Sequence, residues 1–302
     1  MSIPASSLPP EAAFPQSAAL TARFTALAET GSTNDDLVAR ATGDEAVDWP
    51  DFSVLITDNQ TRGRGRLGRT WLAPTGKSLA ISVLLRPSLA DGSSLPLGSY
   101  GWFPLLAGAA MTKAVRQVVI AGHELTVAEA AAAGEEDVAE APPVMLKWPN
   151  DVQISGYKVS GILSELLPIT AGGAPGGVVI GAGLNVSLDE HDLPTLTSTS
   201  LTLVTGSAVS PDAVLAGYLS ALAELYRSFL AAGGDAVASG LHAEVSALCG
   251  TLGQDVRVEL PGGGELLGSA VAIESDGRLR VRERSSGEET SVAAGDVTHL
   301  RY

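Results

Sequence analysis

The sequence predicts an α+β protein with two parts, a larger domain of strands and helices and a small all-β domain at its C-terminal end. Up to about residue 249, short apolar runs with strand character alternate with longer stretches with helix character. From residue 250 onward the pattern changes to five short alternating runs separated by glycine turns, which is typical of a small barrel. A chain of 302 residues is long enough to bury a core in each part.

The N-terminal residues 1–22 mix Ser, Pro and Ala without a sustained period, so we expect a flexible tail, too short for a winged-helix DNA-binding domain. A few residues later the chain opens a helix. Ser32 or Thr33 can cap it, and two following aspartates favour the positive end of the helix dipole. From this segment alone, a plain helix start and a ligand contact both stay open as interpretations.

The densest run of positive charge lies at residues 58–71, between predicted strands at 52–56 and 79–85. In this loop Arg62, Arg64, Arg66 and Arg69 are interleaved with Gly63, Gly65 and Gly68. Guanidinium groups on a backbone that approaches a ligand closely are suited to holding an anion, and the loop has few apolar anchors, so we expect it to be mobile when empty. The alternatives are a solvated surface turn or an arm for nucleic acid.

Two nucleotide-binding motifs fail in this region. The loop glycines formally match G-x-G-x-x-G, but the dinucleotide motif needs a helix immediately afterwards, whereas Pro74 and Gly76 precede a strand. The segment Gly76-Lys77-Ser78 resembles the end of a P-loop, but Trp71 occupies the position of the first glycine. Neither motif supports a nucleotide site of its class.

Composition narrows the function. A formal net charge of −15 argues against nucleic acid as the main partner and favours a small anionic ligand at the basic loop. The single cysteine, Cys249, excludes an internal disulfide, and no clustered thiols or histidines suggest a structural metal. No basic segment followed by an apolar core opens the chain, and no apolar run reaches the length of a membrane span. We expect a cytoplasmic protein with no membrane partner.

The remaining elements follow from hydrophobic period and turn residues. The interval 122–143 is rich in Ala and acidic residues, and we expect a surface insertion that is partly helical. Gly181 and Gly183 interrupt an apolar strand, which indicates a bulge or the close approach of a ligand. The expected helices span 102–119, 211–230 and 235–248, and the expected strands span 23–27, 144–148, 152–154, 159–167 and 178–186.

Lys147 is unusual because it lies in the otherwise apolar strand 144–148, just before the turn Pro149-Asn150-Asp151. A lysine in such a strand must reach solvent, extend along the surface or meet an anion. The strand pattern alone leaves a structural and a functional role open.

Several blocks of the sequence together resemble the biotin protein ligases, from about residue 23 to the C-terminus. The matching residues are Ser32-Thr33-Asn34, Gln60, Gly63-Arg64-Gly65-Arg66-Leu67-Gly68-Arg69 with Trp71, Lys147-Trp148-Pro149-Asn150-Asp151, Lys158-Val159-Ser160-Gly161-Ile162-Leu163-Ser164-Glu165, and Gly181-Ala182-Gly183-Leu184-Asn185-Val186. Leu67 stands where many relatives have a basic residue. The first 20 residues and the acidic insertion are outside the resemblance.

The resemblance implies a mixed β-sheet flanked by helices, the class II synthetase-like or SH2-like catalytic domain, at residues 23–249, and an SH3-like barrel at 250–302. It implies that biotin and ATP give biotinyl-5′-adenylate and pyrophosphate. A lysine on the biotin carboxyl carrier protein domain of a biotin-dependent carboxylase then takes the biotinyl group. The implied cofactors are ATP and Mg²⁺, with biotin as substrate. The type implied is monofunctional, without a DNA-binding domain.

The resemblance also implies roles for residues. Biotin's carboxylate and the α-phosphate of ATP repel each other, so cations must neutralise both. We expect Lys147 to be the catalytic residue that contacts both anions, with Arg66 assisting from the loop. The implied biotin-binding residues are Ser32, Thr33, Asn34, Gln60, Arg64, Gly65, Arg66, Lys147 and Gly161. The implied ATP- and adenylate-binding residues are Arg64, Arg66, Arg69, Trp71, Lys147, Gly183 and Asn185, with Trp71 stacking on adenine. Asp151 is a candidate ligand of magnesium, which phosphates and water otherwise hold.

Two rival functions stay open. A lipoate ligase or acyltransferase of the same superfamily shares the sheet and uses a comparable lysine, but usually lacks an arginine-glycine loop in this form. A nucleic-acid-binding regulator would use the basic loop as an arm, and its binding would be sensitive to salt.

Overall fold

The computed structural model describes residues 11–134, 138–170, 173–260, 264–293 and 296–300. A seven-stranded sheet forms the centre of the larger part, with strand order β1-β2-β3-β7-β6-β5-β4. Its strands are β1 (Arg23–Ala26), β2 (Ser53–Thr57), β3 (Ser78–Leu85), β4 (Val144–Lys147), β5 (Asp151–Ile154), β6 (Tyr157–Leu166) and β7 (Val178–Asn185). β1 and β2 are parallel and the other pairs are antiparallel, so the expected mixed sheet is confirmed.

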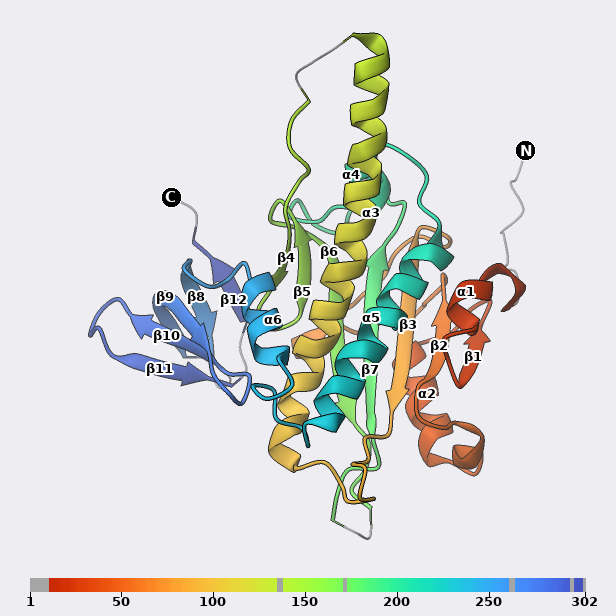
Figure 1. The fold of residues 1–302 in the computed structure, drawn as a ribbon, viewed down its shortest axis with the longest axis vertical. Coiled ribbons are helices and arrows are strands. Elements are labelled where there is room, and N and C mark those ends of the chain that lie inside the picture. The colour runs from red at the N-terminus through yellow and green to blue at the C-terminus, as the bar shows by residue number, and fades with distance from the viewer. Residues whose placement is uncertain (1–10, 135–137, 171–172, 261–263, 294–295, 301–302) are drawn as a thin grey trace.

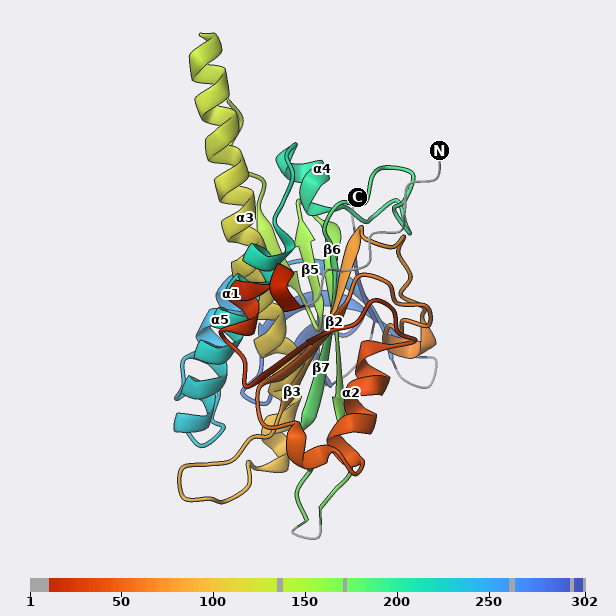
Figure 2. The ribbon, with the colours of Figure 1, turned by 90° about the vertical axis from the view of Figure 1, so that its right-hand side faces the viewer.

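Helices cover both faces of this sheet (Figures 1 and 2). On one face lie α3 (Phe103–Ala133), α5 (Pro211–Ala231), α6 (Leu241–Leu248) and the short helices α1 (Pro15–Ala18) and α4 (Leu201–Thr205). On the other face α2 (Thr33–Thr42) lies alone among the longer helices (Figure 2). The end of the sheet that α2 leaves uncovered is available for a site.

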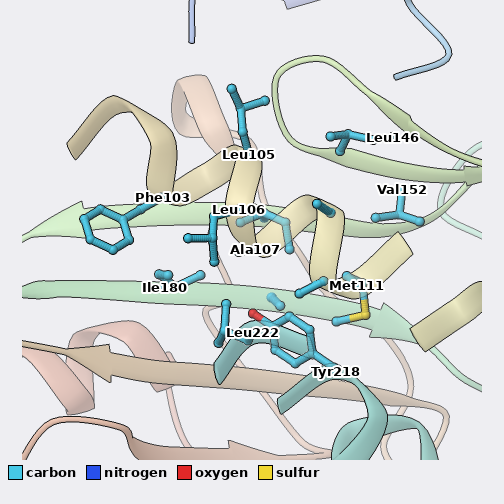
Figure 3. Packing of buried hydrophobic residues seen from close by; sticks show 14 of the residues in the cluster. Phe103, Leu105, Leu106, Ala107, Met111, Leu146, Val152, Ile180, Tyr218 and Leu222 are labelled. Atoms are coloured by element: carbon cyan, nitrogen blue, oxygen red, sulfur yellow. The ribbon is translucent and has the colours of Figure 1, made fainter. Parts of the chain in front are cut away.

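Two cores follow from the alternation of side chains along the strands. In β2, Val54 and Ile56 join the large core under α3 and α5, whereas Leu55 joins the smaller core under α2. Figure 3 shows part of the large core, to which Met111 of α3, Tyr218 of α5 and Ile180 of β7 all contribute. Because these strands are buried on both faces, they read in sequence as continuous apolar runs rather than as alternating ones.

The expectation of a flexible tail through residue 22 is wrong for the residues around α1. Phe14 is buried in the large core, and α1 follows it. The backbone N–H groups of Gln16 and Ser17 donate to the Asp212 carboxylate at distances of 3.1 and 3.0 Å, and the Ser17 hydroxyl donates to the same group at 2.7 Å. A carboxylate at the first turn of α5 therefore holds this segment, an anchor that its own composition does not reveal.

Two helix boundaries also differ from the sequence predictions. α3 does not end near residue 119 but continues to Ala133, since alanine is the strongest helix former, and it ends at Gly134, whose φ is +80°. Much of the predicted acidic insertion is thus a helix that projects past the sheet (Figure 1). α6 starts at Leu241 rather than at 235, because Asp235 caps a turn and Gly240 has a left-handed φ. Within the described residues, the stretch Leu97–Ala133 is long and apolar enough to span a membrane, but 67% of its most apolar window is buried in this fold.

The C-terminal residues form a second, five-stranded antiparallel sheet with strand order β11-β10-β9-β8-β12. Its strands are β8 (Asp255–Glu259), β9 (Glu265–Ile273), β10 (Leu279–Glu283), β11 (Glu289–Val292) and β12 (Asp296–His299). The five predicted strands are confirmed. The described ladder leaves β11 and β12 as edges, so the sheet is an open one. It packs beside α6 and the β4 edge of the main sheet (Figure 1).

Candidate ligand-binding and active site

A pocket of about 510 Å³, counting the part that is open to solvent, lies on the α2 face of the main sheet. Pockets of this size hold small molecules. Ten of the residues predicted for the site line it: Ser32, Thr33, Asn34, Gln60, Arg64, Gly65, Arg66, Trp71, Gly161 and Gly183. The pocket therefore joins four segments, namely the start of α2, the arginine-glycine loop, β6 and β7. These segments are separated in the sequence and are brought together by the fold.

One end of the pocket is an uncharged hydrogen-bonding cluster. Ser32 is the N-cap of α2 and accepts from the backbone N–H of Asp35 at 3.3 Å, so the predicted cap is confirmed. The N–H and the hydroxyl of Thr33 both donate to Oε1 of Gln60, at 2.9 and 3.2 Å. The Ser82 hydroxyl of β3 lies 2.8 Å from the Thr33 hydroxyl and 2.6 Å from Oδ1 of Asn34. Ser82, which the sequence did not single out, thereby orients both residues.

Three glycines leave room for side chains above the sheet. A Cβ atom on Gly181 would lie 2.5 Å from Oδ1 of Asn34, and one on Gly183 would overlap the ring of Trp71. One on Gly161 would lie 2.8 Å from Nζ of Lys158. β7 pairs with both neighbours without a register shift, so the bulge allowed by the sequence is absent from this strand. The close approach is made by the protein's own side chains, which form the pocket wall.

The basic loop is held by acidic residues on two elements. The guanidinium of Arg64 forms an ion pair with Asp35 of α2 and with Glu165 of β6, the latter at 3.0 Å. Desolvation of Arg64 acts to lower its pKa, but the bonds and charges of Glu165 and Asp35 outweigh it, so its pKa is raised. Glu165 also accepts from the Asn34 amide at 2.8 Å. Glu165 thus joins the loop to the hydrogen-bonding cluster.

The other end of the pocket is cationic, and its lysine is Lys158. The Nζ atom of Lys158 lies 2.6 Å from Oδ1 of Asp151 and 5.5 Å from the centroid of the Trp71 ring. Arg66 of η3 (Arg66–Gly68) is the second cation, and its guanidinium donates to Oδ1 of Asn150 at 3.0 Å. Lys158 and Asn150 line the pocket, yet the sequence predictions gave neither a role.

Lys147 ends β4, as the sequence predicted, and lies beside the residues that line the pocket. Among the described residues that line the pocket, Lys158 is the lysine and Lys147 is absent. Lys147 pairs with Asp151 across β4 and β5, and Asp151 pairs with Gly161 across β5 and β6. Two strand spacings, about 10 Å, therefore separate Lys147 from the pocket floor on the same face of the sheet. Lys158 is thus a second lysine at this site, and the role of Lys147 in contacting both anions stays a prediction.

A β-bulge explains why the sequence pattern missed Lys158. Strict alternation along β6 would place Lys158 with Ser160 and Ile162, on the buried face under α3. The pairing of β5 with β6 shifts register, so that Val152 opposes Ser160 but Gln153 opposes Lys158, and Val159 is the extra residue. A bulge of this kind turns a side chain to the other face. The sequence feature that could have indicated this lysine is the spacing of Lys158 three positions before Gly161, in the block 158–165.

Three further predicted residues lie outside the pocket lining. Asn185 is buried, and its amide donates to the Thr199 carbonyl at 2.9 Å, so it holds a neighbouring segment. Arg69 lies at the far end of the loop, where its carbonyl accepts from Gly65. Asp151 pairs with Lys158, and the described residues contain no group of three acidic, histidine or cysteine side chains that could hold a metal. A contribution of Asp151 to magnesium binding stays a prediction, since phosphates and water would supply the other ligands.

The segment 187–199 flanks Lys158 and is tied down at two points. The backbone N–H of Lys158 donates to the Thr197 carbonyl at 2.8 Å, and its carbonyl accepts from Thr199 at 2.8 Å. Nearer the start of the segment, Lys77 forms ion pairs with Asp189, at 2.9 Å, and with Asp192. The hydrogen bond from Lys77 lowers the pKa of Asp189 to about 2. The strand that carries Lys158 is therefore braced on both sides.

These features define a class of protein. An uncharged hydrogen-bonding cluster stands over Gly181 of β7. Trp71 covers Gly183, about 7 Å further along the strand, and Lys158 stands over Gly161 beside it on β6. Such a pocket on a mixed sheet is that of an α+β protein that binds a small molecule with a polar head at one end and an acid group at the other. The cations at the acid end suit chemistry on anions.

Comparison with known proteins agrees with this class. Residues 30–185 match the Biotin/lipoate A/B protein ligase family, and residues 251–300 match the Biotin protein ligase C terminal domain. The chain belongs to the biotin/lipoate A/B protein ligase family, and the resemblance to biotin protein ligases is confirmed. It is 34% identical over 277 residues to the biotin–[acetyl-CoA-carboxylase] ligase of Mycobacterium tuberculosis, covering 91% of this chain and 88% of the relative.

Other similar proteins have the same character. The biotin–[acetyl-CoA-carboxylase] ligase of Paracoccus denitrificans is 32% identical over 162 residues, which are 54% of this chain and 53% of the relative. The structure of the biotin protein ligase from Aquifex aeolicus with biotin and ATP superposes with a TM-score of 0.66 at 24% identity, covering 93% of this chain and 100% of that one, and shows the shared fold. The structure of the biotin protein ligase from Leishmania major with biotinyl-5-AMP superposes with a TM-score of 0.53 at 25% identity, covering 90% of this chain and 98% of that one.

Proposed function

We propose that this protein is a biotin protein ligase, which activates biotin with ATP to biotinyl-5′-adenylate and transfers the biotinyl group to a lysine of a biotin carboxyl carrier protein. The observation that carries the proposal is the pocket itself, where one cavity joins an uncharged polar cluster to the cations Lys158 and Arg66. The similarity to the biotin–[acetyl-CoA-carboxylase] ligase of Mycobacterium tuberculosis, which covers 91% of this chain, supports the same reaction.

The uncharged cluster is suited to the ureido ring of biotin. That ring offers two N–H donors and one carbonyl acceptor, so it needs partners of both kinds. Ser32, Thr33, Asn34 and Gln60 supply hydroxyl and amide groups at one end of the cavity, and Ser82 and Glu165 orient them. The apolar body of the ring system would then lie beside Trp71, whose indole ring covers Gly183. In this arrangement Trp71 contacts biotin rather than adenine.

The cationic end performs the first chemical step. An oxygen of the biotin carboxylate attacks the α-phosphorus of ATP, a new C–O–P linkage forms, and the bond to the β-phosphate breaks to release pyrophosphate. Lys158 and Arg66 reduce the repulsion between the two anions and stabilise the charge that develops on the α-phosphate. Asp151 and Asn150 hold these two cations at 2.6 and 3.0 Å, so they are oriented before the substrates meet.

Lys147 and Arg69 belong further out along the same site. Lys147 lies on the pocket face two strands beyond the floor, where the β- and γ-phosphates of a nucleotide would extend from the carboxylate end. Mg²⁺ would arrive bound to these phosphates, because the described residues offer no acidic group of three for it.

The second step transfers the biotinyl group. The carrier lysine attacks the carbonyl carbon of the mixed anhydride, an amide bond forms, and AMP leaves as the C–O bond breaks. The Arg64 ion pairs with Asp35 and Glu165 close the loop over the pocket and limit the access of water to the adenylate. The cytoplasmic location and the lack of a nucleic-acid partner stay predictions from composition.

One experiment tests the function and its nearest rival. The protein is incubated with ATP and either biotin or lipoate, and pyrophosphate release is followed; the mass of an added biotin carrier domain is then measured. We expect turnover and a mass increase with biotin. Turnover with lipoate alone would show that the protein is a lipoate ligase.

A further inference from the structure

The β9–β10 turn of the C-terminal sheet, residues 273–277, is docked on the larger domain. Its carbonyl groups accept hydrogen bonds from three side chains on three different elements. Nε1 of Trp102 donates to the Ser275 carbonyl at 2.9 Å, and Nε1 of Trp148 donates to the Gly277 carbonyl at 3.1 Å. Nε2 of His242 lies 2.7 Å from the Ile273 carbonyl. Alternate carbonyls of one turn are thus each bonded to the larger domain.

The Trp148 contact is buried, and the Trp102 and His242 contacts are partly buried. Trp102 and Trp148 are each at most 2% exposed, and the His242 ring packs edge-on against Trp102 with centroids 5.9 Å apart. A buried carbonyl that loses its donor costs free energy, so the turn has one favourable orientation on the larger domain. The docking is therefore specific in geometry, not a general apolar contact.

A second contact fixes the backbone of Trp148. Its N–H donates to the hydroxyl of Thr251 at 3.0 Å, and that hydroxyl lies 3.1 Å from Nε2 of His299 on β12. Trp148 is consequently held by both its main chain and its side chain, in each case by residues of the C-terminal part. Its position depends on where the C-terminal sheet sits.

Trp148 immediately precedes the turn that orients the two pocket cations. Asn150 accepts from Arg66, and its amide donates to the Ile162 carbonyl at 2.7 Å. Asp151 follows and forms the 2.6 Å ion pair with Lys158. The chain from the β9–β10 turn through Trp148 to Asn150 and Asp151 is short and rigid, since each residue is bonded on both sides.

We propose that Trp148, supported by Trp102 and Thr251, is a positioning residue of the active site, through which the C-terminal sheet sets the placement of Arg66 and Lys158. This proposal rests on the proposed function and adds to it a role for residues that do not touch substrate. The hydrogen-bonding cluster at the other end of the pocket, on α2 and β3, is attached to none of these residues by the bonds described, so the effect is confined to the phosphate end of the reaction.

The test uses the full-length chain and the variants Trp148→Phe, Trp102→Phe and Thr251→Val, with Trp49→Phe as the matched control. Trp49 is also fully buried, but it packs under α2, away from the C-terminal sheet. Biotin-dependent pyrophosphate release gives kcat and KM for ATP, and calorimetry gives the Kd for biotin. We expect Trp148→Phe to lower kcat/KM for ATP by about tenfold, the equivalent of one lost hydrogen bond to a buried carbonyl, and to change the biotin Kd by less than about threefold.

The outcomes separate the alternatives. Thr251→Val keeps the side-chain volume and removes the hydroxyl that accepts from Trp148 and contacts His299, so it tests the proposal even if Trp148→Phe does not fold. A result within about twofold of wild type for both variants would overturn the proposal. An equal loss of biotin affinity and ATP turnover, or an equal effect of Trp49→Phe, would also overturn it, because a purely structural role lowers both together. If the wild-type protein releases no pyrophosphate with biotin, the proposed function fails instead.

Discussion

The ammonium group of Lys158 lies 2.6 Å from a carboxylate oxygen of Asp151, although alternation along β6 would bury Lys158 on the opposite face of the sheet. A β-bulge at Val159 places the lysine over Gly161, which has no side chain in the way. Both side chains are partly buried, and Lys158 lines the pocket, where its ammonium group is placed to bind an anion.

Replacing this lysine should abolish the first step. We predict that Lys158→Ala lowers kcat for biotin-dependent pyrophosphate release by at least about 100-fold, because a preorganised charge at the reacting phosphate is lost. Lys147→Ala is the comparison, and it should act mainly on KM for ATP, since Lys147 lies two strands away. Retained adenylation in Lys158→Ala, together with its loss in Lys147→Ala, would restore Lys147 as the central lysine.

Glu165 should matter for biotin affinity without touching the reaction centre. Its carboxylate joins the Asn34 amide to the Arg64 guanidinium. Glu165→Gln removes the charge that holds Arg64 and should weaken biotin binding about tenfold, as expected for the loss of a charged hydrogen bond. Isothermal titration measures this Kd. The control is Glu259→Gln, an exposed position on the C-terminal sheet. The prediction would be contradicted if the wild type, Glu165→Gln and Glu259→Gln bound biotin with equal affinity.

The glycine of β7 beneath Trp71 should tolerate no side chain. A methyl group on Gly183 would overlap the indole ring, so Gly183→Ala must displace Trp71 or the strand. We predict at least about a tenfold loss in kcat/KM for biotin, with a shift in tryptophan fluorescence. Gly98→Ala is a matched control because nothing lies within 4 Å of the added methyl group. A fully active Gly183→Ala with unchanged fluorescence would show that Trp71 does not form the pocket wall.

The carboxyl group of Asp51 should make stability depend on pH. Desolvation raises its pKa above the ordinary 3.8, despite hydrogen bonds from the Arg86 backbone N–H and the Tyr226 hydroxyl. Because the folded state holds this proton more tightly than the unfolded state, stability is lost as the pH rises from about 4 through the folded-state pKa. Asp51→Asn, which keeps an acceptor oxygen, should remove that loss. Urea unfolding at about pH 4 and pH 7 tests this; the variant's advantage should be larger at pH 7, and an advantage that grows on acidification would refute it.

The sequence alone was enough to predict most of the secondary structure and most of the pocket lining. Hydrophobic period and turn residues located most strands and α5, because local backbone preference and burial act over a few residues. The blocks around Ser32, Gln60, Arg64, Gly161 and Gly183 identified most of the pocket lining, since their chemistry depends on residue type and order. The five alternating runs after residue 250 predicted the second sheet.

Tertiary structure decided which lysine enters the pocket and what holds it there. Lys147 of β4 and Lys158 of β6 lie on either side of β5, and the register shift after Val152 turns Lys158 toward the cavity. The ion pair of Arg64 with Glu165 and the hydrogen bond of Trp148 to Gly277 each connect residues far apart in the chain. The burial of Phe14 likewise depends on packing against distant elements. Such contacts depend on packing between elements, so no local pattern in the sequence specifies them.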